Sequence, residues 1–554
     1  MAFALPRLAR PADGRAWLSL AVTGLAFFAT LVVSAQNEHA PYDISPGQFA
    51  VLLAAVMPPV AAVVAAWAVQ RPWPAFVAIL LLAPCWDAAQ VAWQVGPVQV
   101  LLQTVFVLAL TAGWLLRPTG SDRDEPGIAA EPRGADEDDD GGSPIGRLRR
   151  LDTLQVGAGA TVALLLLAGL STLRSPDVET SATVLLHSII ESVAMGLLFF
   201  ALGPTRRRLV VLLIALGVSV ALGGLIDLVQ TLPTGGGLAS LQANRLYFSR
   251  LTFFNVGLFG EMIAMAAPLI VGALLCRRTL GLSRAVIALL SIAGLIGVPA
   301  LFLTFSKSGW AATAAGILLC VLLLAETWRR RAAIVVGSAL VSAFVVPWPA
   351  LILQVVPPAN DAYRSVMVSI MGQSRFDSWN PATIAGEGSL SERFYATTAG
   401  IRMAIDHPLL GIGLAQFQSQ YAANYKPAQA HLTPDHAHSW LPEIGAELGL
   451  LVLALVVVIF GAALLGLWRL YRAPPDPETR SLAAILLSAL VAWVVVATAF
   501  GGELYRPWRN MSSDYVMMVM ITAAALALPR VSRARRRPRT SLSADAASSA
   551  GVSR

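Results

Sequence analysis

Two histidines and two glutamates precede a long apolar run in the segment DHAHSWLPEIGAELG, residues 435–449. If Ser439 caps a helix whose first turn includes Pro442, His438 lies at the positive N-terminal end of that helix. The helix dipole there disfavours the imidazolium ion and keeps the ring neutral, which is the form that a general base needs. His438 is therefore the first candidate for a catalytic group.

Two carboxylates follow on one face of the same predicted helix. Glu443 and Glu447 are four residues apart, and Gly445 and Gly449 are spaced in the same way on a neighbouring face, where another helix could approach closely. An acidic residue in a first helical turn stabilises the helix dipole, which is an ordinary explanation for Glu443. Glu447 comes directly before the apolar run LGLLVLALVVVIFGAALL, so it is the second candidate for chemistry.

A metal site is an alternative use of the histidines. His431, His436 and His438 form the pattern H-x4-H-x-H. No matching constellation of carboxylates or cysteines accompanies them, and the segment has the composition of a loop rather than of a rigid helix face. We therefore expect neither a metal nor a cofactor. Elsewhere, His187 and Glu191 have helical i, i+4 spacing inside an apolar run, which predicts a buried pair.

The composition shows what must position these residues. Of the 554 residues, 56% are hydrophobic and 13% are charged, whereas a soluble domain has about 25% charged residues. Apolar runs of about 18 or more residues recur along the chain, and each is long enough to cross a bilayer. Because backbone groups in lipid must pair within their own segment, the sequence predicts an all-α polytopic membrane protein.

We expect about 12 to 14 transmembrane helices. They lie near 16–35, 49–69, 73–93, 98–116, 153–172, 182–202, 209–229, 257–276, 284–304, 309–325, 333–355, 443–468, 482–501 and 514–529. In this arrangement the clusters around Arg147–Arg150, Arg206–Arg208, Arg277 and Arg278, Arg329–Arg331 and the motif RVSRARRRPR fall on one side. The positive-inside rule then places both termini in the cytoplasm.

Six regions follow from this pattern. They are N-terminal helices at 1–116, a disordered acidic cytoplasmic linker at 117–150, a transmembrane core at 151–355, a large outward loop at 356–441, C-terminal helices at 442–529 and a basic cytoplasmic tail at 530–554. Within the outward loop, a helix with Ser391 as its N-cap is broken by Pro408, and GLAQFQSQYAANY follows with an apolar face. Two short amphipathic helices on the membrane surface fit this segment.

Basic residues on the outward side are not explained by the positive-inside rule. Arg250 precedes a span that contains Asn255 and Glu261, and snorkelling to the interface is its ordinary alternative explanation. Lys307 lies between two apolar runs in LFLTFSKSGW, where the turn is too tight to leave the membrane, so we expect it to have a partner or an anionic ligand. The outward basic residues are Arg245, Arg250, Lys307, Arg364, Arg375, Arg393, Arg402, Lys426, Arg506 and Arg509.

Four segments, in order along the chain, resemble the O-antigen ligase and O-antigen polymerase superfamily of bacterial envelope enzymes. RLTFFNVGLFGEMIAMAAPL is similar to the family pattern R-x-x-G-x-F-x-N-x-N, and LTFSKSGW is similar to T-x-S-R-G with Lys307 in place of arginine. ERFYATTAGIRMAIDHPLLGIGLAQFQSQY resembles the arginine, helix and D-H-P-L-x-G-x-G-x-x-x-F segment. The family's ligase signature is a histidine, then Asn, Ser or Gln, nine residues, a glycine, two residues, and Gly or Thr. His438, Ser439 and Gly449 satisfy this spacing, and Val452 stands where the signature has its final Gly or Thr. The resemblance covers about residues 240–455.

The resemblance implies a GT-C-like fold and a metal-independent, inverting glycosyltransferase. Such an enzyme transfers a glycan from an undecaprenyl diphosphate carrier to a saccharide acceptor, lipid A core or another glycan, on the outer face of the bacterial cytoplasmic membrane. In this scheme His438 is the general base and Glu447 orients it or binds acceptor hydroxyls. Cations would stabilise the diphosphate leaving group; the candidates are Arg250, Lys307, Arg245 and Arg402. Candidate acceptor or supporting residues are Asn255, Ser439 and Glu443.

Two other functions remain open at this stage. A polymerase of lipid-linked repeats has the same donor and differs in its acceptor. A transporter or flippase of lipid-linked glycans also needs cations and carboxylates, but it places them near the midplane of the membrane. The predicted polar residues gather at the outer ends of spans, which favours an enzyme.

Overall fold

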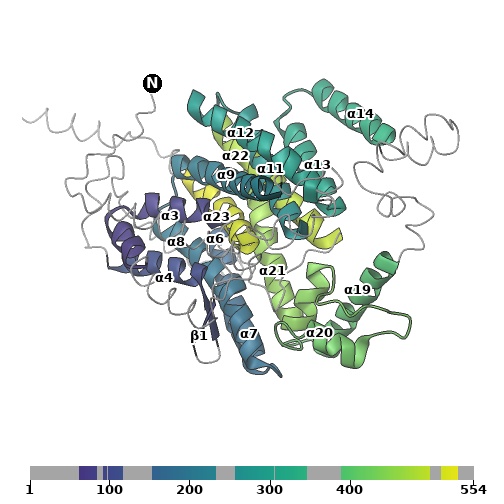
Figure 1. Cartoon of the computed structure of the whole chain (residues 1–554). Helices are drawn as coiled ribbons and strands as arrows, with labels where there is room; N and C mark the ends of the chain where they lie inside the picture. Colours follow the sequence, from purple (N-terminus) through teal and green to yellow (C-terminus); the bar gives the residue numbers. More distant parts are fainter. Residues whose placement is uncertain are drawn as a thin grey trace, which may run out of the picture.

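The computed structural model describes residues 61–83, 92–95, 98–116, 153–231, 256–304, 306–345, 388–499 and 513–533. The predicted first span, the acidic linker, residues 356–387 of the outward loop and residues 534–554 of the basic tail lie outside these residues. The described part is built almost entirely from helices (Figure 1).

Seven helical segments in the described ranges are long and apolar enough to cross a membrane. They are Thr153–Leu173, Val178–Ala201, Arg206–Ile226, Arg284–Thr304, Trp440–Arg472, Pro477–Thr498 and Tyr515–Ser532. Five shorter apolar helices accompany them: Ala61–Gln70, Pro72–Leu81, Gln103–Leu115, Phe259–Leu275 and Ser308–Leu324. The prediction of an all-α polytopic membrane protein is confirmed.

The element bounds agree closely with the predicted spans over most of the chain. The helices are α3 (Pro72–Leu81), α4 (Leu102–Leu115), α6 (Thr153–Leu173), α7 (Val178–Val184), α8 (Glu191–Ala201), α9 (Arg206–Thr231), α11 (Val256–Leu275), α12 (Arg284–Thr304), α13 (Lys307–Leu324), α14 (Trp328–Val345), α19 (Gly388–Asp406), α20 (Phe417–Gln420), α21 (Trp440–Arg472), α22 (Pro477–Ala499) and α23 (Ser513–Arg533). Two π-helical turns, η4 (Leu185–Ile190) and η7 (Tyr421–Tyr425), interrupt or extend them.

The predicted spans at 73–93 and 98–116 are wrong in detail. Helix α3 ends at Leu81, and the strands β1 (Ala92–Val95) and β2 (Val98–Leu101) pair antiparallel before α4 begins. The sequence between the two strands is the dipeptide Gly-Pro, a composition that favours turns. Hydropathy measures the length of an apolar run but does not distinguish a helix from a short strand rich in valine.

The centre of the bundle is the contact of α11 with α13 and α22. A Cβ atom added to Gly309 of α13 would lie 2.9 Å from the Cα of Gly260 in α11, so the two backbones touch there. Gly272, one turn before the end of α11, likewise faces Ile485 of α22, where an added Cβ would be 2.5 Å from a side-chain carbon. Small residues at such crossings allow helices in a membrane to pack closely.

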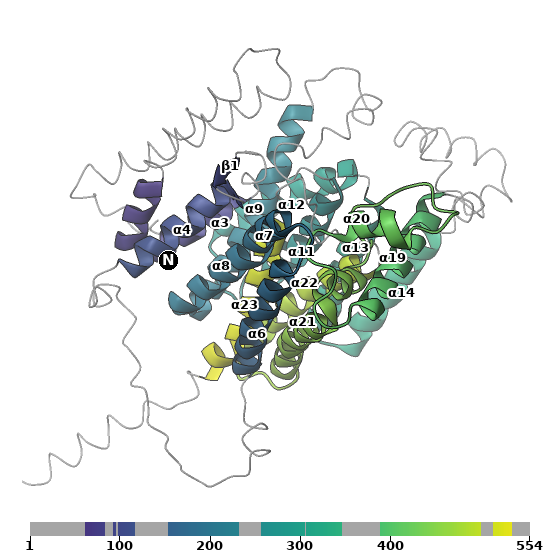
Figure 2. The ribbon, with the colours of Figure 1, turned by 90° about the horizontal axis from the view of Figure 1, so that it is seen from below.

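Long-range hydrogen bonds define two ends of the bundle. At the end that we call the loop end, Ser171 and Ser181 donate to the carbonyl oxygens of Leu410 and Leu414. At the opposite end, which we call the arginine end, Arg206 of α9 binds Asp476 between α21 and α22, and Arg331 of α14 binds the Tyr471 hydroxyl. Figure 1 shows α19 and α20 together at one side of the bundle beside α21, and the view from below gives the same arrangement (Figure 2).

The predicted pair inside the second long span is confirmed. His187 Nδ1 and Glu191 Oε1 lie 2.9 Å apart, and both side chains are buried. Thr104 of α4 donates its hydroxyl to the same carboxylate oxygen at 2.5 Å. His187 lies in the π-helical turn η4, whose wider backbone is common at functional positions in helices.

Candidate functional site

Helix α21 begins next to the end of α22. Ser439 is its N-cap residue, as predicted, but the Ser439 side chain does not cap the helix. Its hydroxyl donates instead to the carbonyl oxygen of Thr498 at 3.1 Å, and the indole N–H of Trp440 donates to the Thr498 hydroxyl at 2.7 Å. These two bonds fix where the apolar helix starts.

His438 lies immediately before this helix in an unusual backbone conformation. Its φ angle is 54°, in the left-handed region that residues other than glycine rarely adopt. The ring is half-buried and meets the ring of His436 edge to face, with centroids 4.1 Å apart. His436 is 1% exposed, and its Nδ1 lies 2.7 Å from an oxygen of Asp435. The three side chains therefore form a continuous polar row at the loop end.

Helix α19 holds the segment that carries His438. The hydroxyl of Thr397 donates to the carbonyl oxygen of Ala437 at 2.8 Å. At Gly400 an added Cβ would lie 2.9 Å from the Cβ of Ala437, so α19 packs directly on the chain next to His438. Further along, the buried carboxylate of Glu392 accepts the backbone N–H groups of His431 and Leu432, at 2.6 and 3.2 Å. The predicted helix in the outward loop thus exists, although it begins at Gly388 rather than after Ser391.

Gly449 breaks the helical backbone of α21. Its φ and ψ angles are 86° and 167°, and an added Cβ would be 2.5 Å from the carbonyl oxygen of Leu409. The break frees backbone groups that the segment after α19 uses: the N–H of Ile412 donates to Ala446 O at 2.8 Å, and the N–H of Leu450 donates to Pro408 O at 2.8 Å. The glycine that completes the histidine motif is therefore where another stretch of backbone inserts against the helix.

Glu447 fastens the same segment through its side chain. Its Oε2 accepts the N–H of Ala415 at 3.0 Å, and its Oε1 accepts the N–H of Phe417 at 2.8 Å. Ala415 has a φ angle of 60°, so this carboxylate stabilises a tight turn directly before α20. Both oxygens of Glu447 are engaged by backbone groups, which fits a positioning role better than proton transfer.

Glu443 lines a small enclosed cavity together with Glu447. The cavity is about 30 Å³ in volume and is also lined by Ser188 of η4 and Tyr515 of α23. A water molecule needs about 10–15 Å³ measured in this way, so one or two waters fit. Glu443 is 1% exposed and therefore belongs to the interior of the bundle rather than to its surface.

The predicted cationic residues are described only in part. Arg245, Arg250 and Asn255 lie outside the described residues. Arg402 is exposed on α19. Lys307 is the first residue of α13, whose N-cap Ser306 accepts the N–H of Gly309 at 3.1 Å.

The backbone of Lys307 lies at the same end of the bundle as His438. Ala312 of α13 packs with Val496 of α22 and Ala264 of α11. Lys307 is five residues nearer the start of α13, about 7.5 Å along the helix axis. Thr498, which binds Ser439, lies at the corresponding end of α22. The turn before α13 and the histidine segment therefore share the loop end.

Glu392, Thr397 and Ser171 hold this region and were not singled out from the sequence. Ser171 of α6 donates to the carbonyl oxygens of both Leu410 and Glu447, at 2.6 and 3.0 Å. Their partners are backbone groups tens to hundreds of residues away, so no local motif marks them. Within the described part of the chain, no group of three or more His, Cys, Asp or Glu side chains could hold a metal ion.

These features define a multi-pass membrane protein with polar groups gathered at one end of a helical bundle. Residues 292–457 match the family model described as O-antigen ligase, and the match runs from within α12 to within α21. This match supports membership of the chain in the O-antigen ligase superfamily, in agreement with the family predicted from the sequence. No curated protein matches the chain.

Proposed function

We propose that the protein is a glycosyltransferase that moves a glycan from an undecaprenyl diphosphate carrier to a saccharide acceptor. The family match supports a role of ligase or polymerase type in polysaccharide biosynthesis. The observation that carries the finer proposal is His438, which lies inside the matched segment and is held at the start of α21 in a left-handed conformation.

The proposed reaction is a single displacement at the anomeric carbon. The acceptor oxygen attacks this carbon, the C–O bond to the diphosphate breaks, and the bonding electrons leave with the diphosphate. His438 takes the proton of the acceptor hydroxyl, a role that contributes about 10² to 10⁴ in rate. Attack from the side opposite the leaving group inverts the configuration.

Cations would stabilise the charge that develops on the diphosphate, without a metal ion. We assign this role to Arg250 and Lys307, with Arg245 and Arg402 as further candidates. The shared end of Lys307 and His438 supports the assignment, because donor and base must meet at one place.

The contacts of the remaining candidates suggest supporting roles. We infer that Glu447 is a positioning residue, since its two oxygens hold the turn at Ala415 and Phe417. The hydrogen bond from Ser439 to Thr498 joins the start of α21 to the end of α22, and so fixes the position of the adjacent His438. Asn255 remains a candidate for contact with the acceptor, and the buried Glu443 a candidate for a supporting role.

We place the loop end on the outer face of the cytoplasmic membrane. The opposite end gathers Arg206–Arg208, Arg329–Arg331, Arg469, Arg472, Arg480 and Arg530 at the ends of five helices. Positive loops favour the cytoplasm. The site would then face the periplasm or the cell exterior, where a flipped lipid-linked donor is available.

Two alternatives differ in acceptor or in reaction. A polymerase would use a second lipid-linked repeat as acceptor. A transporter or flippase is favoured by one observation, the buried cluster of Thr104, His187 and Glu191 inside a span. The candidate base lies at the end of the bundle instead, and this position favours an enzyme over a transporter.

Deletion of the gene, followed by electrophoresis of the surface glycan, tests the proposal. A ligase predicts the loss of all attached chains, and a polymerase predicts attachment of single repeats. An unchanged pattern would contradict both. Accumulation of donor on the cytoplasmic side would support a flippase.

A further inference from the structure

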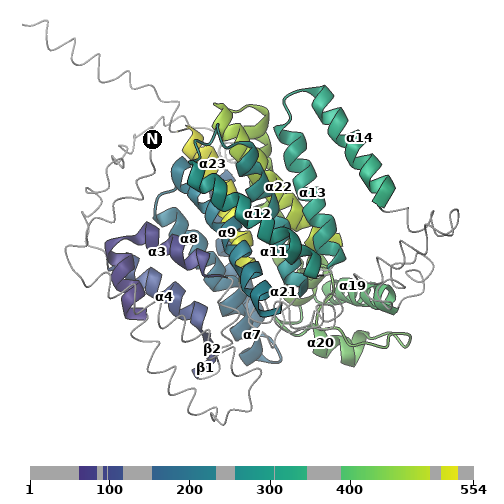
Figure 3. The same cartoon turned by 45° about the horizontal axis from the view of Figure 1, so that its top comes forward.

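A groove of about 600 Å³ opens at the arginine end of the bundle, far from the histidine segment. It lies where the end of α13, the start of α14, the end of α21 and the start of α22 meet. Figure 3 shows α14 beside α13 at the edge of the bundle. The floor of the groove is apolar and includes Leu322, Leu323 and Val335.

Three arginines and two aromatic rings form the rim of this groove. The guanidinium carbon of Arg480 lies 5.2 Å from the ring centroid of Tyr471, and that of Arg472 lies 5.7 Å from the ring of Trp468. Arg331 donates to the Tyr471 hydroxyl at 3.1 Å, and this hydroxyl donates to the carbonyl oxygen of Leu323 at 2.9 Å. The aromatic rings thus hold the three cations around one opening.

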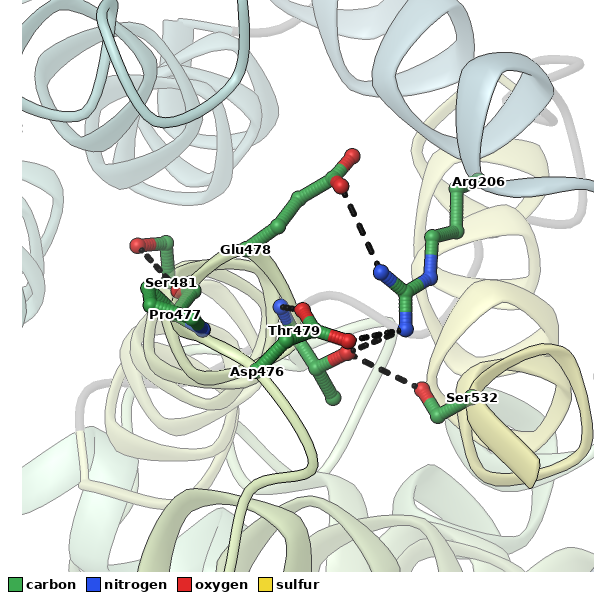
Figure 4. Close-up of polar contacts among 7 residues, drawn as sticks. All are labelled: Arg206, Asp476, Pro477, Glu478, Thr479, Ser481 and Ser532. Carbon is green, nitrogen blue, oxygen red and sulfur yellow. Dashed lines mark hydrogen bonds and ion pairs between the residues drawn. The ribbon is translucent and has the colours of Figure 1, made fainter. Parts of the chain in front are cut away.

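Carboxylates in the neighbouring segments pair with arginines outside the groove: Asp476 and Glu478 with Arg206, and Glu326 with Arg330. Figure 4 shows that Asp476 and Glu478 turn toward Arg206, with nitrogen–oxygen distances of 2.5 and 3.4 Å. The same guanidinium donates a hydrogen bond to the Thr479 hydroxyl at 2.9 Å. Among the residues that the structure describes, no ion pair joins Arg331, Arg472 or Arg480 to a carboxylate. Three positive charges therefore face one cavity, and the described residues that line it include no acid.

We propose that this groove binds an anionic phospholipid of the cytoplasmic leaflet. The phosphate of the lipid would lie among Arg331, Arg472 and Arg480, because guanidinium groups bind phosphate oxygens through paired hydrogen bonds. Basic pockets between transmembrane helices on the cytoplasmic side commonly hold such headgroups.

The apolar floor distinguishes a lipid from a free phosphate. An acyl chain would run along Leu322 and Val335, and Val335 is 51% exposed. Trp468, which is 43% exposed, is an aromatic residue at the level of the helix end, where tryptophan rings face lipid headgroups. This inference is independent of the proposed glycosyl transfer, since the groove and the histidine segment lie at opposite ends of the bundle.

Lipid binding to the purified full-length protein tests the proposal. A short-chain phosphatidylglycerol is titrated below its micellar concentration and followed by native mass spectrometry and by thermal shift, beside phosphatidylcholine of the same chain length and inorganic phosphate. We expect phosphatidylglycerol to bind at least tenfold more tightly than the other two probes. Equal binding of phosphatidylcholine, or equal competition by inorganic phosphate, would overturn the proposal.

Matched variants locate the site. The double substitution Arg472→Gln and Arg480→Gln should weaken phosphatidylglycerol binding about tenfold or more. The pair Arg329→Gln and Arg330→Gln removes the same charge from exposed positions outside the groove and should leave binding unchanged. Equal losses in both pairs would show unspecific attraction and contradict a site.

A further variant tests the groove without removing any charge, so the proposal stays testable if the double arginine variant does not fold. Val335→Trp fills the groove and removes no charge, so it should also reduce binding of phosphatidylglycerol. Its exposed position makes the larger side chain compatible with folding. Unchanged binding in Val335→Trp would contradict an acyl chain in the groove.

Discussion

Glu447 holds Phe417 at the start of α20, with the backbone N–H of Phe417 donating to Glu447 Oε1 at 2.8 Å. The second oxygen accepts the N–H of Ala415, so a single buried carboxylate fixes the turn that follows α19. The chain leading to this turn packs on α21 beside Gly449 through the backbone of Leu409, and α21 begins at Trp440, two residues after His438 with its left-handed φ angle. The helix that follows the candidate base and the segment packed against that helix are thus held together by hydrogen bonds.

Glu447→Gln should destabilise the protein. The amide offers one acceptor oxygen, and its NH₂ group would face a backbone N–H donor, so one buried donor loses its partner. The expected loss is roughly 1–3 kcal/mol of unfolding free energy. Thermal unfolding of the purified protein measures it. Glu326→Gln, which alters an exposed carboxylate, is the control and should change stability by less than about 0.5 kcal/mol.

Gly449→Ala should be severely destabilising. The new Cβ would meet the Leu409 carbonyl at 2.5 Å, and the backbone angle of 86° is unfavourable for alanine. A cost of at least about 1–3 kcal/mol is expected from the backbone alone. Gly461→Ala in the same helix is the matched control, because no atom lies within 4 Å of its added Cβ. Comparable stabilities of the two variants would contradict the break at Gly449.

Thr397→Val should reduce glycan transfer more than it reduces stability. The hydroxyl of Thr397 binds the carbonyl oxygen of Ala437, next to His438, so its loss frees the segment that positions the base. We expect a loss of about 1 kcal/mol in stability and a lower rate of glycan attachment. Thr397→Ser should restore the rate, and Thr398→Val on the adjacent position should leave it unchanged. A rate in Thr397→Val equal to that of the wild type would remove α19 from the positioning of His438.

Asp476→Asn should destabilise the arginine end in a pH-dependent way. Burial alone raises the pKa of the Asp476 carboxyl, but hydrogen bonds from Arg206 and Thr479 and the guanidinium charge hold this pKa below its usual range. A group whose pKa is lowered by folding stabilises the protein above its unfolded pKa, and this stability is lost as the pH falls through the folded pKa.

The difference between the wild type and Asp476→Asn should therefore be roughly 1–2 kcal/mol at pH 7 and should shrink below about pH 4. Measuring the unfolding free energy of both proteins between pH 7 and pH 3 checks this expected pH dependence. A difference that is constant down to pH 3 would mean that the carboxylate charge does not matter.

Much of the fold was predictable because its signal is local. Apolar runs located α6, α9, α12 and α22 to within a few residues, and the i, i+4 spacing predicted the contact of His187 with Glu191. The hairpin at β1 and β2 was missed, since a short run rich in valine satisfies the same hydropathy.

The site was predictable only in its helical part. The position of His438 at the start of α21 follows from the polar-to-apolar transition. The roles of Glu392 and Thr397 do not follow from any local sequence pattern, because their partners are backbone groups 39 or 40 residues away. Gly449 was expected to admit a neighbouring helix, and the close neighbour is instead the backbone at Leu409.

The most direct test replaces His438 in the producing bacterium and quantifies the surface glycan at equal membrane abundance. His438→Asn is the sharpest variant, because asparagine tolerates a left-handed backbone and cannot act as a base at neutral pH. His431→Ala, which changes an exposed histidine of the same loop, is the control. We predict at least a hundredfold loss of glycan transfer in His438→Asn and wild-type transfer in His431→Ala. Wild-type transfer by His438→Asn would contradict the assignment of His438 as the general base.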